Sequence, residues 1–236
     1  MRPKELIRLS GLTKTYGQGD AAFQALKGID LSINVGEFVA VMGHSGSGKS
    51  TLMNILGCLD MSTRGVYAYN NIEVQKLQTN QRSMLRRHSL GFIFQGFNLL
   101  ARTSALENVE LPLLYRGLSR SKRHEMATEA LCSVGLPDKL KNKPSELSGG
   151  QQQRVAIARA IVTNPTTLFA DEPTGNLDST TTSEVMNLLT QLNKEKGITI
   201  LMVTHEDDVA SYADRIVCLS DGNILSDTSN NRKDRK

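Results

Sequence analysis

The chain carries Gly43-His-Ser-Gly-Ser-Gly-Lys-Ser-Thr51 between an apolar run, Phe38–Met42, and a helical pattern that begins at Leu52. This spacing fits G-x-x-x-x-G-K-[ST], in which small residues let successive backbone N–H groups converge on phosphate oxygens at a helix N-terminus. The plain alternative is a turn that merely joins a strand to a helix. With glycine at about 7% of residues, only about 0.01 chance matches are expected in a chain of this length. The stretch therefore predicts a phosphate-binding loop.

The loop residues have separate expected roles at a nucleotide. Lys49 is expected to reach the β and γ phosphates, and the Ser50 hydroxyl is expected to ligate Mg²⁺. The other loop positions would surround the phosphates, and they are Gly43, His44, Ser45, Gly46, Ser47, Gly48 and Thr51.

Two carboxylates follow a second apolar run, Leu168-Phe-Ala-Asp-Glu172. The carboxyl ends of buried strands are where α/β sheets place their ligands. Asp171 suits the Mg²⁺ shell, and Glu172 suits positioning or deprotonating an attacking water. An acidic pair after a strand is most often a solvated strand end, but the phosphate-binding loop in the same chain favours the functional interpretation.

A second anion-binding helix start is predicted at Leu147-Ser-Gly-Gly-Gln-Gln-Gln-Arg154. Ser148, Gly149 and Gly150 open a helix near Gln151, so a hydroxyl, flexible backbone N–H groups and the positive end of a helix dipole face outward. One nucleotide has no obvious use for two such helix starts.

Two single residues have open interpretations. His205 follows a predicted strand at the sheet edge that carries Asp171 and Glu172, and a lone histidine there is more often structural than catalytic. The shared edge favours a His205 that hydrogen-bonds a γ phosphate and orients Glu172. Tyr16 precedes a polar loop, and its ring could equally stack on a base or cover an edge of the sheet.

Length and composition limit the class of protein. The 236 residues suit one large α/β domain or a core with an inserted subdomain. The 28 basic and 24 acidic residues are too evenly balanced to imply nucleic-acid binding.

The three scattered cysteines predict reduced thiols in a cytosolic protein. The N-terminus lacks the apolar core of a signal peptide, and no run approaches the ~20 residues that span a bilayer. We therefore expect any membrane role to come through a partner or a further part of the chain.

Hydrophobic periodicity predicts alternating strands and helices. The predicted strands are Leu6–Leu9, Leu26–Ile33, Phe38–Met42, Gly65–Tyr69, Gly91–Gln95, Thr167–Ala170 and Ile198–Val203. The predicted helices after the phosphate loop are Thr79–His88, Ala105–Tyr115 with a break or kink at Pro112, Lys122–Val134, Gln151–Val162, Thr180–Lys194 and Asp207–Tyr212, before a hairpin at Asp221–Gly222. This order predicts an α/β fold with a mainly parallel sheet, covered on both faces, and a helical insert between its strands.

Together the motifs resemble the ATP-binding cassette (ABC) ATPases over almost the whole chain. Gly43–Thr51 is similar to their Walker A, Leu168–Glu172 to Walker B, Leu147–Gln151 to the signature motif and Gly175–Asp178 to the D-loop. Gln95 matches the Q-loop glutamine, which would join Ser50 and Asp171 at the metal; His205 matches the switch histidine, and Tyr16 the aromatic that stacks on adenine.

The resemblance implies a particular architecture and particular ligands. It implies a P-loop NTPase (RecA-like) core of about residues 1–95 and 163–228, an antiparallel β subdomain and an inserted helical subdomain of about residues 96–162. The polar composition of residues 229–236, apart from the resemblance, predicts a disordered tail that is either a natural end or the start of a linker. The implied ligands are ATP and Mg²⁺. Two copies would sandwich two ATP molecules, each Walker A facing the partner's Ser148, Gly149, Gly150, Gln151 and Asp178.

Four stretches look most like the group that contains the MacB macrolide exporters and the LolD lipoprotein-release ATPases: Gly57–Asp60, Phe94–Leu100, Glu107–Pro112 and Ala170–Asp178. That group implies an ATP-dependent homodimer on the cytoplasmic face of the inner membrane. It also implies a transmembrane permease, docked near Gln95–Leu100, and no contact of the ATPase with cargo or nucleic acid. Two positions depart from the family pattern: His44 replaces the usual Pro or Ala, and Gly96 follows Gln95.

Two other functions are weighed against this one. A soluble cassette ATPase acting on nucleic acid or ribosomes would carry a long coiled coil or a second cassette, and the sequence shows neither. A nucleotide-binding regulator without turnover would have lost Glu172 or Lys49, and both are present. The cargo, and whether the polypeptide continues past Lys236 into transmembrane helices, stay open.

Overall fold

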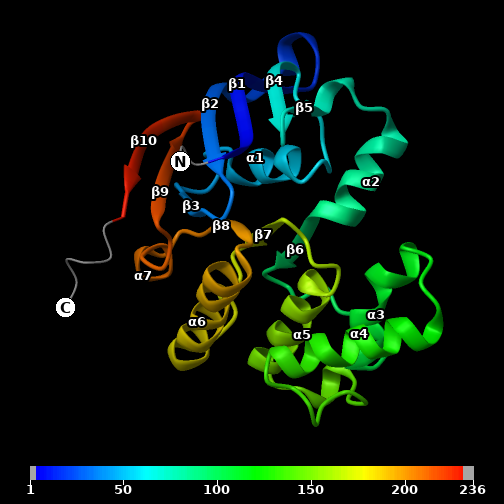
Figure 1. Ribbon diagram of the computed structural model, residues 1–236. Coiled ribbons are helices and arrows are strands. Elements are labelled where there is room, and N and C mark those ends of the chain that lie inside the picture. The colour runs from blue at the N-terminus through cyan, green and yellow to red at the C-terminus, as the bar shows by residue number, and fades with distance from the viewer. Residues whose placement is uncertain (1–3, 231–236) are drawn as a thin grey trace.

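The computed structural model describes residues 4–230, and two β-sheets form its centre (Figure 1). The larger sheet has six strands in the order β10-β9-β3-β8-β7-β6. Its strands are β3 (Phe38–Met42), β6 (Leu90–Phe94), β7 (Thr167–Asp171), β8 (Thr199–Val203), β9 (Arg215–Ser220) and β10 (Asn223–Ser229). All neighbours pair in parallel except β10, which is antiparallel to β9. The predicted, mainly parallel sheet is confirmed.

The smaller sheet is antiparallel and has the order β2-β1-β4-β5. Its strands are β1 (Glu5–Tyr16), β2 (Phe23–Asn34), β4 (Arg64–Tyr69) and β5 (Ile72–Glu73). The prediction for β1 stopped too early, at Leu9. The register shifts between Leu9 and Leu12, where Gly11 has a φ of 55°, so the bulge resets the alternation and Leu12 is again fully buried.

Each predicted helix is present. The helices are α1 (Lys49–Leu56), α2 (Thr79–Ser89), α3 (Ala105–Tyr115), α4 (Arg120–Ser133), α5 (Gly149–Ile161), α6 (Ser179–Lys196) and α7 (Asp207–Ala210), with short 3₁₀ turns η1 (Gly19–Ala21), η2 (Val74–Lys76) and η3 (Pro144–Glu146). We predicted a break or a kink at Pro112, and the break is wrong, because α3 continues to Tyr115. Val109 and Leu113 are fully buried in the helical core, and this packing keeps α3 continuous although Pro112 has no N–H to donate.

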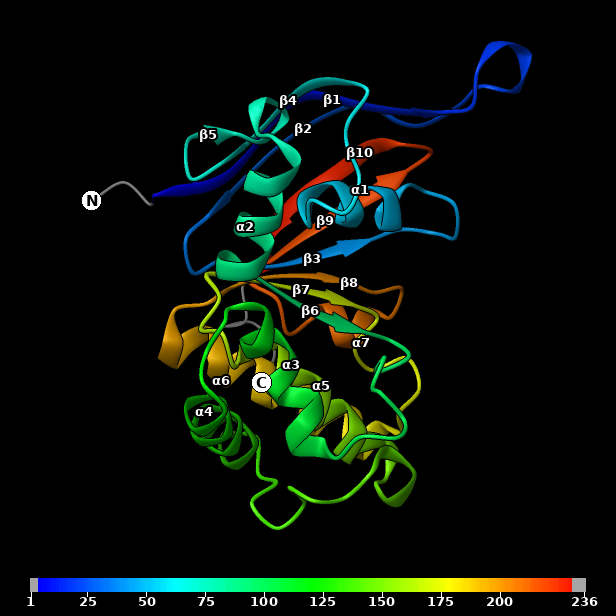
Figure 2. The ribbon, with the colours of Figure 1, turned by 90° about the vertical axis from the view of Figure 1, so that its right-hand side faces the viewer.

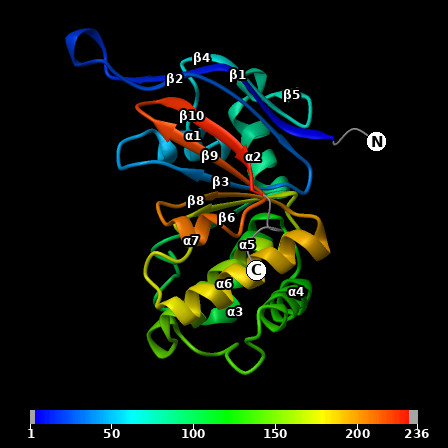
Figure 3. The same cartoon turned by 90° about the vertical axis from the view of Figure 1, so that its left-hand side faces the viewer.

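Alternating residues of the central strands face two different cores. Phe38 and Ala40 of β3 pack into the core made with α3–α6, whereas Val39 and Val41 pack into the core made with α1 and the antiparallel sheet. Figure 2 and Figure 3 show the two layers from opposite sides, with helices α3–α6 on one face of the large sheet. A strand that is buried on both faces reads as a continuous apolar run, which is why β3 has no polar alternation.

The register of the parallel strands places three loops side by side. Val41 of β3 is opposite Val203 of β8, and Val203 is opposite Asp171 of β7. The loops that follow these three residues therefore leave the same edge of the sheet. That edge is where a doubly wound sheet forms its ligand site.

The C-terminal part of the described chain differs from the prediction. The polar tail was expected to begin at Ser229, but Ser229 belongs to β10, and the backbone N–H of Asn230 donates to the Asp214 carbonyl at 2.7 Å. The rest of the predicted tail, residues 231–236, lies outside the described residues. Within residues 4–230, none of the helices has the length and apolar character needed to cross a membrane.

Candidate functional site

Three of the predicted motifs line one cavity of about 650 Å³ at the edge where β3, β7 and β8 end. The cavity is lined by Phe23, Ala25, His44, Ser45, Gly46, Gly48, Lys49, Ser50, Thr51, Asp171, Glu172, Val203 and His205. The loop after β3, the carboxylates after β7 and the histidine after β8 are distant in sequence, and the strand register brings them together.

The loop before α1 has a backbone that side chains would obstruct. A Cβ on Gly43 would come within 2.3 Å of the Leu219 carbonyl oxygen, and one on Gly48 within 2.8 Å of the Ala25 carbonyl oxygen. Gly48 also has a φ of 104° at the position that caps α1. The two glycines therefore allow the tight turn that directs the start of α1 into the cavity.

The polar groups of this loop fit a triphosphate. Lys49 Nζ donates to the carbonyl oxygens of Gly43 and His44 at 2.7 and 2.9 Å, so the ammonium lies inside its own loop. The N-cap residue of α1 is Gly48, which has no side chain to accept from the first N–H groups of the helix. Ser47 Oγ has no hydrogen-bond partner among the described residues, but Ser47 is fully buried and does not line the cavity. A cation and an uncapped helix start together suit an anion with several oxygens.

Oxygen donors suited to Mg²⁺ lie beside the loop. Ser50 offers a hydroxyl and Asp171 a carboxylate, and both line the cavity. Burial raises the pKa of Asp171, the charge of Glu172 raises it further, and the Lys49 ammonium opposes both. A partly buried carboxylate beside a second one is a favourable place for a cation.

Glu172 is held in an unusual conformation next to His205. Its φ is 44°, in the left-handed region, although it is not a glycine and precedes Pro173. His205 Nδ1 lies 2.9 Å from Glu172 Oε1, and a protonated Nδ1 would donate to this carboxylate. The predicted relation between the two side chains is therefore present in the geometry.

Tyr16 does not line the cavity, but its partner across the hairpin does. Its hydroxyl donates to Asp60 Oδ2 at 2.9 Å, and Lys14 Nζ lies 4.7 Å from the centre of its ring. Across the hairpin, Tyr16 pairs with Phe23, which is 62% exposed and does line the cavity. The sequence prediction missed Phe23; a second exposed aromatic on the far side of a hairpin loop from Tyr16 was the available signal.

The other predicted site residues lie apart from the cavity. Gln95 packs beside Gly175, and its carbonyl accepts from Asn176 Nδ2 at 2.9 Å. Ser148 caps α5 by accepting from Gln151 N at 3.3 Å, and the same turn contains Gly149 and Gly150. Asp178 caps α6 by accepting from Thr181 N at 3.0 Å. A single chain therefore does not bring its α5 start to its own phosphate-binding loop.

Comparisons with known proteins identify the class. The ABC transporter family profile matches residues 26–175. The macrolide export ATP-binding/permease protein MacB of Marinobacter nauticus is 50% identical over 228 residues, which cover 97% of this chain and 35% of that protein. YknY of Bacillus subtilis, an uncharacterized ABC transporter ATP-binding protein, is 49% identical, with 96% of this chain and 98% of that one covered. Among solved structures, the dimeric ATP-binding cassette MJ0796, bound to ADP and Pi, superposes on this chain with a TM-score of 0.88. The two chains are 45% identical, and the match covers 96% of this chain and 99% of that one.

The chain belongs to the ABC transporter family, as its motifs predicted. It is an ATP-binding cassette of the ATPase type, whose ligands are ATP and Mg²⁺. Within that family its relatives include export proteins of the MacB kind, of which it spans about a third of the length.

Tyr16→Ala is expected to weaken ATP binding by about 1–3 kcal/mol, the usual contribution of one base stacked on an aromatic ring. Phe23→Ala, measured beside it, shows which of the two rings at the cavity meets the base. Isothermal calorimetry with ATP and with inorganic triphosphate makes the test. An equal loss for triphosphate, which has no base, would mean that Tyr16 supports the fold instead.

Asp60→Asn is expected to lower stability in a pH-dependent way. Partial burial alone would raise the pKa of Asp60, but the hydrogen bonds it accepts, the strongest from Lys14, outweigh burial and hold the pKa below its ordinary value. A lowered carboxyl pKa stabilises the fold above the unfolded pKa of about 3.9, and this contribution disappears as the pH falls through the folded pKa.

The loss for Asp60→Asn should therefore be a few tenths to about 1 kcal/mol at pH 7, since the pair is solvent-screened, and should shrink below about pH 4. Urea unfolding of Asp60→Asn and of the parent chain at pH 7 and below about pH 4 measures this loss of unfolding free energy. The exposed Asp138→Asn serves as the control for a lost negative charge. A loss that is the same at both pH values would contradict the assigned charge interaction.

Proposed function

We propose that two copies of this chain close around two ATP molecules, hydrolyse them, and thereby move a transmembrane partner. One observation carries the proposal: Lys49, Asp171, Glu172 and His205 meet at one cavity, while the α5 start at Ser148 lies apart from it. A second copy can supply that helix start to the open side of the cavity. The dimeric cassette MJ0796, which this chain matches in fold, supports such an assembly.

The chain's own residues have distinct roles in hydrolysis. Lys49 and the loop N–H groups hold the transferred phosphate, and this positioning accounts for most of the catalysis of phosphoryl transfer. Glu172 accepts the proton of the attacking water, and His205 fixes the direction of that carboxylate through the 2.9 Å contact. Ser50 and Asp171 would hold Mg²⁺, which would neutralise charge on the phosphates, whereas Gln95 does not line this cavity.

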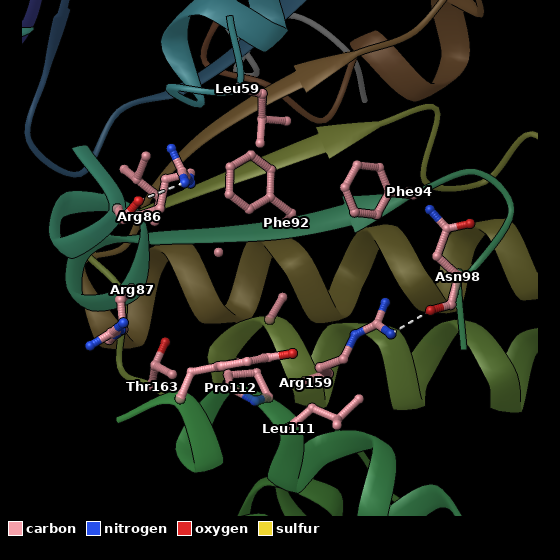
Figure 4. Close-up of a pocket in the computed structure, with 15 residues that line it drawn as sticks. Leu59, Arg86, Arg87, Phe92, Phe94, Asn98, Leu111, Pro112, Arg159 and Thr163 are labelled. Atoms are coloured by element: carbon pink, nitrogen blue, oxygen red, sulfur yellow. Dashed lines mark hydrogen bonds between the residues drawn. The ribbon is translucent and has the colours of Figure 1, made fainter. Parts of the chain in front are cut away.

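The membrane partner is proposed to dock in a second cavity of about 570 Å³ (Figure 4). Aromatic and aliphatic side chains from β6 and α3 line it together with arginines from α2 and α5, and the lining includes Phe92, Phe94, Leu111, Pro112, Tyr115, Arg86, Arg87 and Arg159. An apolar groove with polar edges suits a short amphipathic helix. Of the expected stretch Gln95–Leu100, only Asn98 lines the cavity; Gln95 and Leu100 do not.

Arg159 connects this groove with the Q-loop. Its guanidinium donates to the carbonyl oxygens of Asn98 and Phe97 at 2.6 and 2.8 Å, and Figure 4 shows the first contact. Phe97 and Asn98 both have a positive φ, so Arg159 holds a turn that is strained on its own. A segment seated in the groove would press on this turn, which leads directly to Gln95.

The remaining expectations belong to the same proposal. The core is taken as about residues 1–95 and 163–228, and the helical subdomain as about 96–162, which contains α3, α4 and α5. The cassette works at the cytoplasmic face of the inner membrane without touching cargo. The names of the export relatives, which join an ATP-binding part to a permease, support this arrangement.

Glu172→Gln is expected to bind ATP, to lose about 10²- to 10⁴-fold in turnover, and to accumulate as a dimer. The carboxamide keeps the shape of the side chain but cannot accept the proton of water. Light scattering after size-exclusion chromatography and a phosphate-release assay measure both effects. Full turnover by Glu172→Gln would remove every role assigned to this carboxylate.

Adding Ser148→Arg to Glu172→Gln should return the protein to a monomer, because a large cation at the start of α5 blocks the partner's phosphates. Ser119→Arg is the matched control, since Ser119 caps α4 by accepting from Lys122 N and lies on another helix. Both substitutions remove a serine cap, but only the first should abolish the dimer. Loss of the dimer in both variants would point to damage of the fold.

Tyr115→Glu tests the docking groove. Tyr115 is 69% exposed and lines the groove, whereas Leu225, 76% exposed on β10, lies outside it. A carboxylate at position 115 should abolish stimulation of ATP turnover by the membrane partner and leave turnover of the isolated chain unchanged. Leu225→Glu should change neither. A parallel fall in the isolated chain's turnover would make Tyr115 part of the ATPase core.

A further inference from the structure

A buried glutamine links α5 to the turn that carries Glu172. Gln153 is fully buried, and it is the one polar residue among the buried side chains of α5. Its Nε2 donates to the carbonyl oxygen of Pro173, the residue that follows Glu172. Its Oε1 has no hydrogen-bond partner among the described residues. The Gln153 amide therefore makes one side-chain hydrogen bond, through Nε2, and leaves its Oε1 acceptor unsatisfied in a buried position, which is costly.

The turn after Glu172 needs such support. Glu172 combines a left-handed φ of 44° with a following proline, and both features disfavour its conformation. Its N–H donates to the Val203 carbonyl at 2.9 Å, and its own carbonyl accepts from Gly175 N at 3.2 Å. These bonds fix the residue itself. The next carbonyl, that of Pro173, is fixed by Gln153.

We infer that Gln153 is a positioning residue for ATP hydrolysis, which holds the Glu172–Pro173 turn so that the Glu172 carboxylate points at the attacking water. The inference rests on the proposed role of Glu172. Gln153 lies on the same helix that Ser148 caps, so this hydrogen bond would pass a displacement of α5 on closure of the dimer to the chain's own Glu172.

A role in stability alone does not explain the amide. Replacing Gln153 by methionine, which has a similar length, removes the orphan Oε1 and leaves the Pro173 carbonyl without its donor. One unsatisfied acceptor replaces another, so the two effects on stability oppose each other. The direction of Glu172, in contrast, loses its support outright, and a small misplacement of a catalytic group is costly in rate.

Gln153→Met and Gln75→Met form a matched pair for the test. Gln75, in η2, also donates its Nε2 to a main-chain carbonyl, that of Gly65 at 2.8 Å, and its Oε1 likewise has no hydrogen-bond partner among the described residues. Gln153→Met should lower kcat by about 10- to 100-fold with little change in KM for ATP, because Lys49 and its loop are untouched. Gln75→Met should keep the parental kcat, because its contact is not part of the Glu172 turn. Melting temperatures of both variants should stay near that of the parent.

A second measurement separates positioning from closure. In the Glu172→Gln background, Gln153→Met should still form the ATP-dependent dimer, because the inferred role concerns the direction of Glu172 and not the binding of ATP. Equal kcat values for the two methionine variants would overturn the inference. A lowered melting temperature together with loss of the dimer would also overturn it, in favour of a structural role. A parent chain without ATP turnover would instead contradict the proposed function on which the inference rests.

Discussion

The site depends on the parallel register of β3, β8 and β7, because this register makes the three strands end at the same level along one edge of the sheet. Val41, Val203 and Asp171 lie side by side, so the phosphate-binding loop, His205 and Glu172 begin from adjacent points. A shift of one residue in any of these strands would move each buried side chain into the other apolar core, where the close packing is shaped for different side chains. The register is therefore maintained by packing on both sides, and the positions of the proposed catalytic groups follow from it.

Helix α5 holds the two strained turns that flank this site. Gln153 supports the turn after Glu172, and Arg159, six residues further along, supports the turn at Phe97 and Asn98. The residues Glu172, Phe97 and Asn98 all have a positive φ without being glycine. Such conformations persist only where the surroundings determine them, and they concentrate at functional sites. One helix thus connects its own start at Ser148, the turn that carries Glu172 and the proposed docking groove.

Much of the fold and of the site could be predicted from the sequence, because local patterns carry them. The apolar runs of β3, β7 and β8 and the glycine spacing of Gly43 and Gly48 act within a few residues. What escaped prediction depends on contacts between distant segments. The extension of β1 past Leu9 needs the bulge at Gly11, and Phe23 reaches the cavity only because the hairpin brings it beside Tyr16. Gln153 stands in a run of three glutamines that looks solvated, and only packing shows that it is buried.

The central claim is that the phosphate-binding loop of one copy faces the α5 start of another. The most direct measurement mixes the parent chain with an affinity-tagged Lys49→Ala chain and adds an ATP analogue that carries a photoreactive group on its γ phosphate. The tagged chain lacks the lysine that holds the triphosphate, so it should bind the probe only through a partner. After irradiation, mass spectrometry should find the label on the tagged chain's peptide around Ser148, and only when the parent chain is present. A label confined to the parent chain, although the mixed dimer forms, would contradict the account.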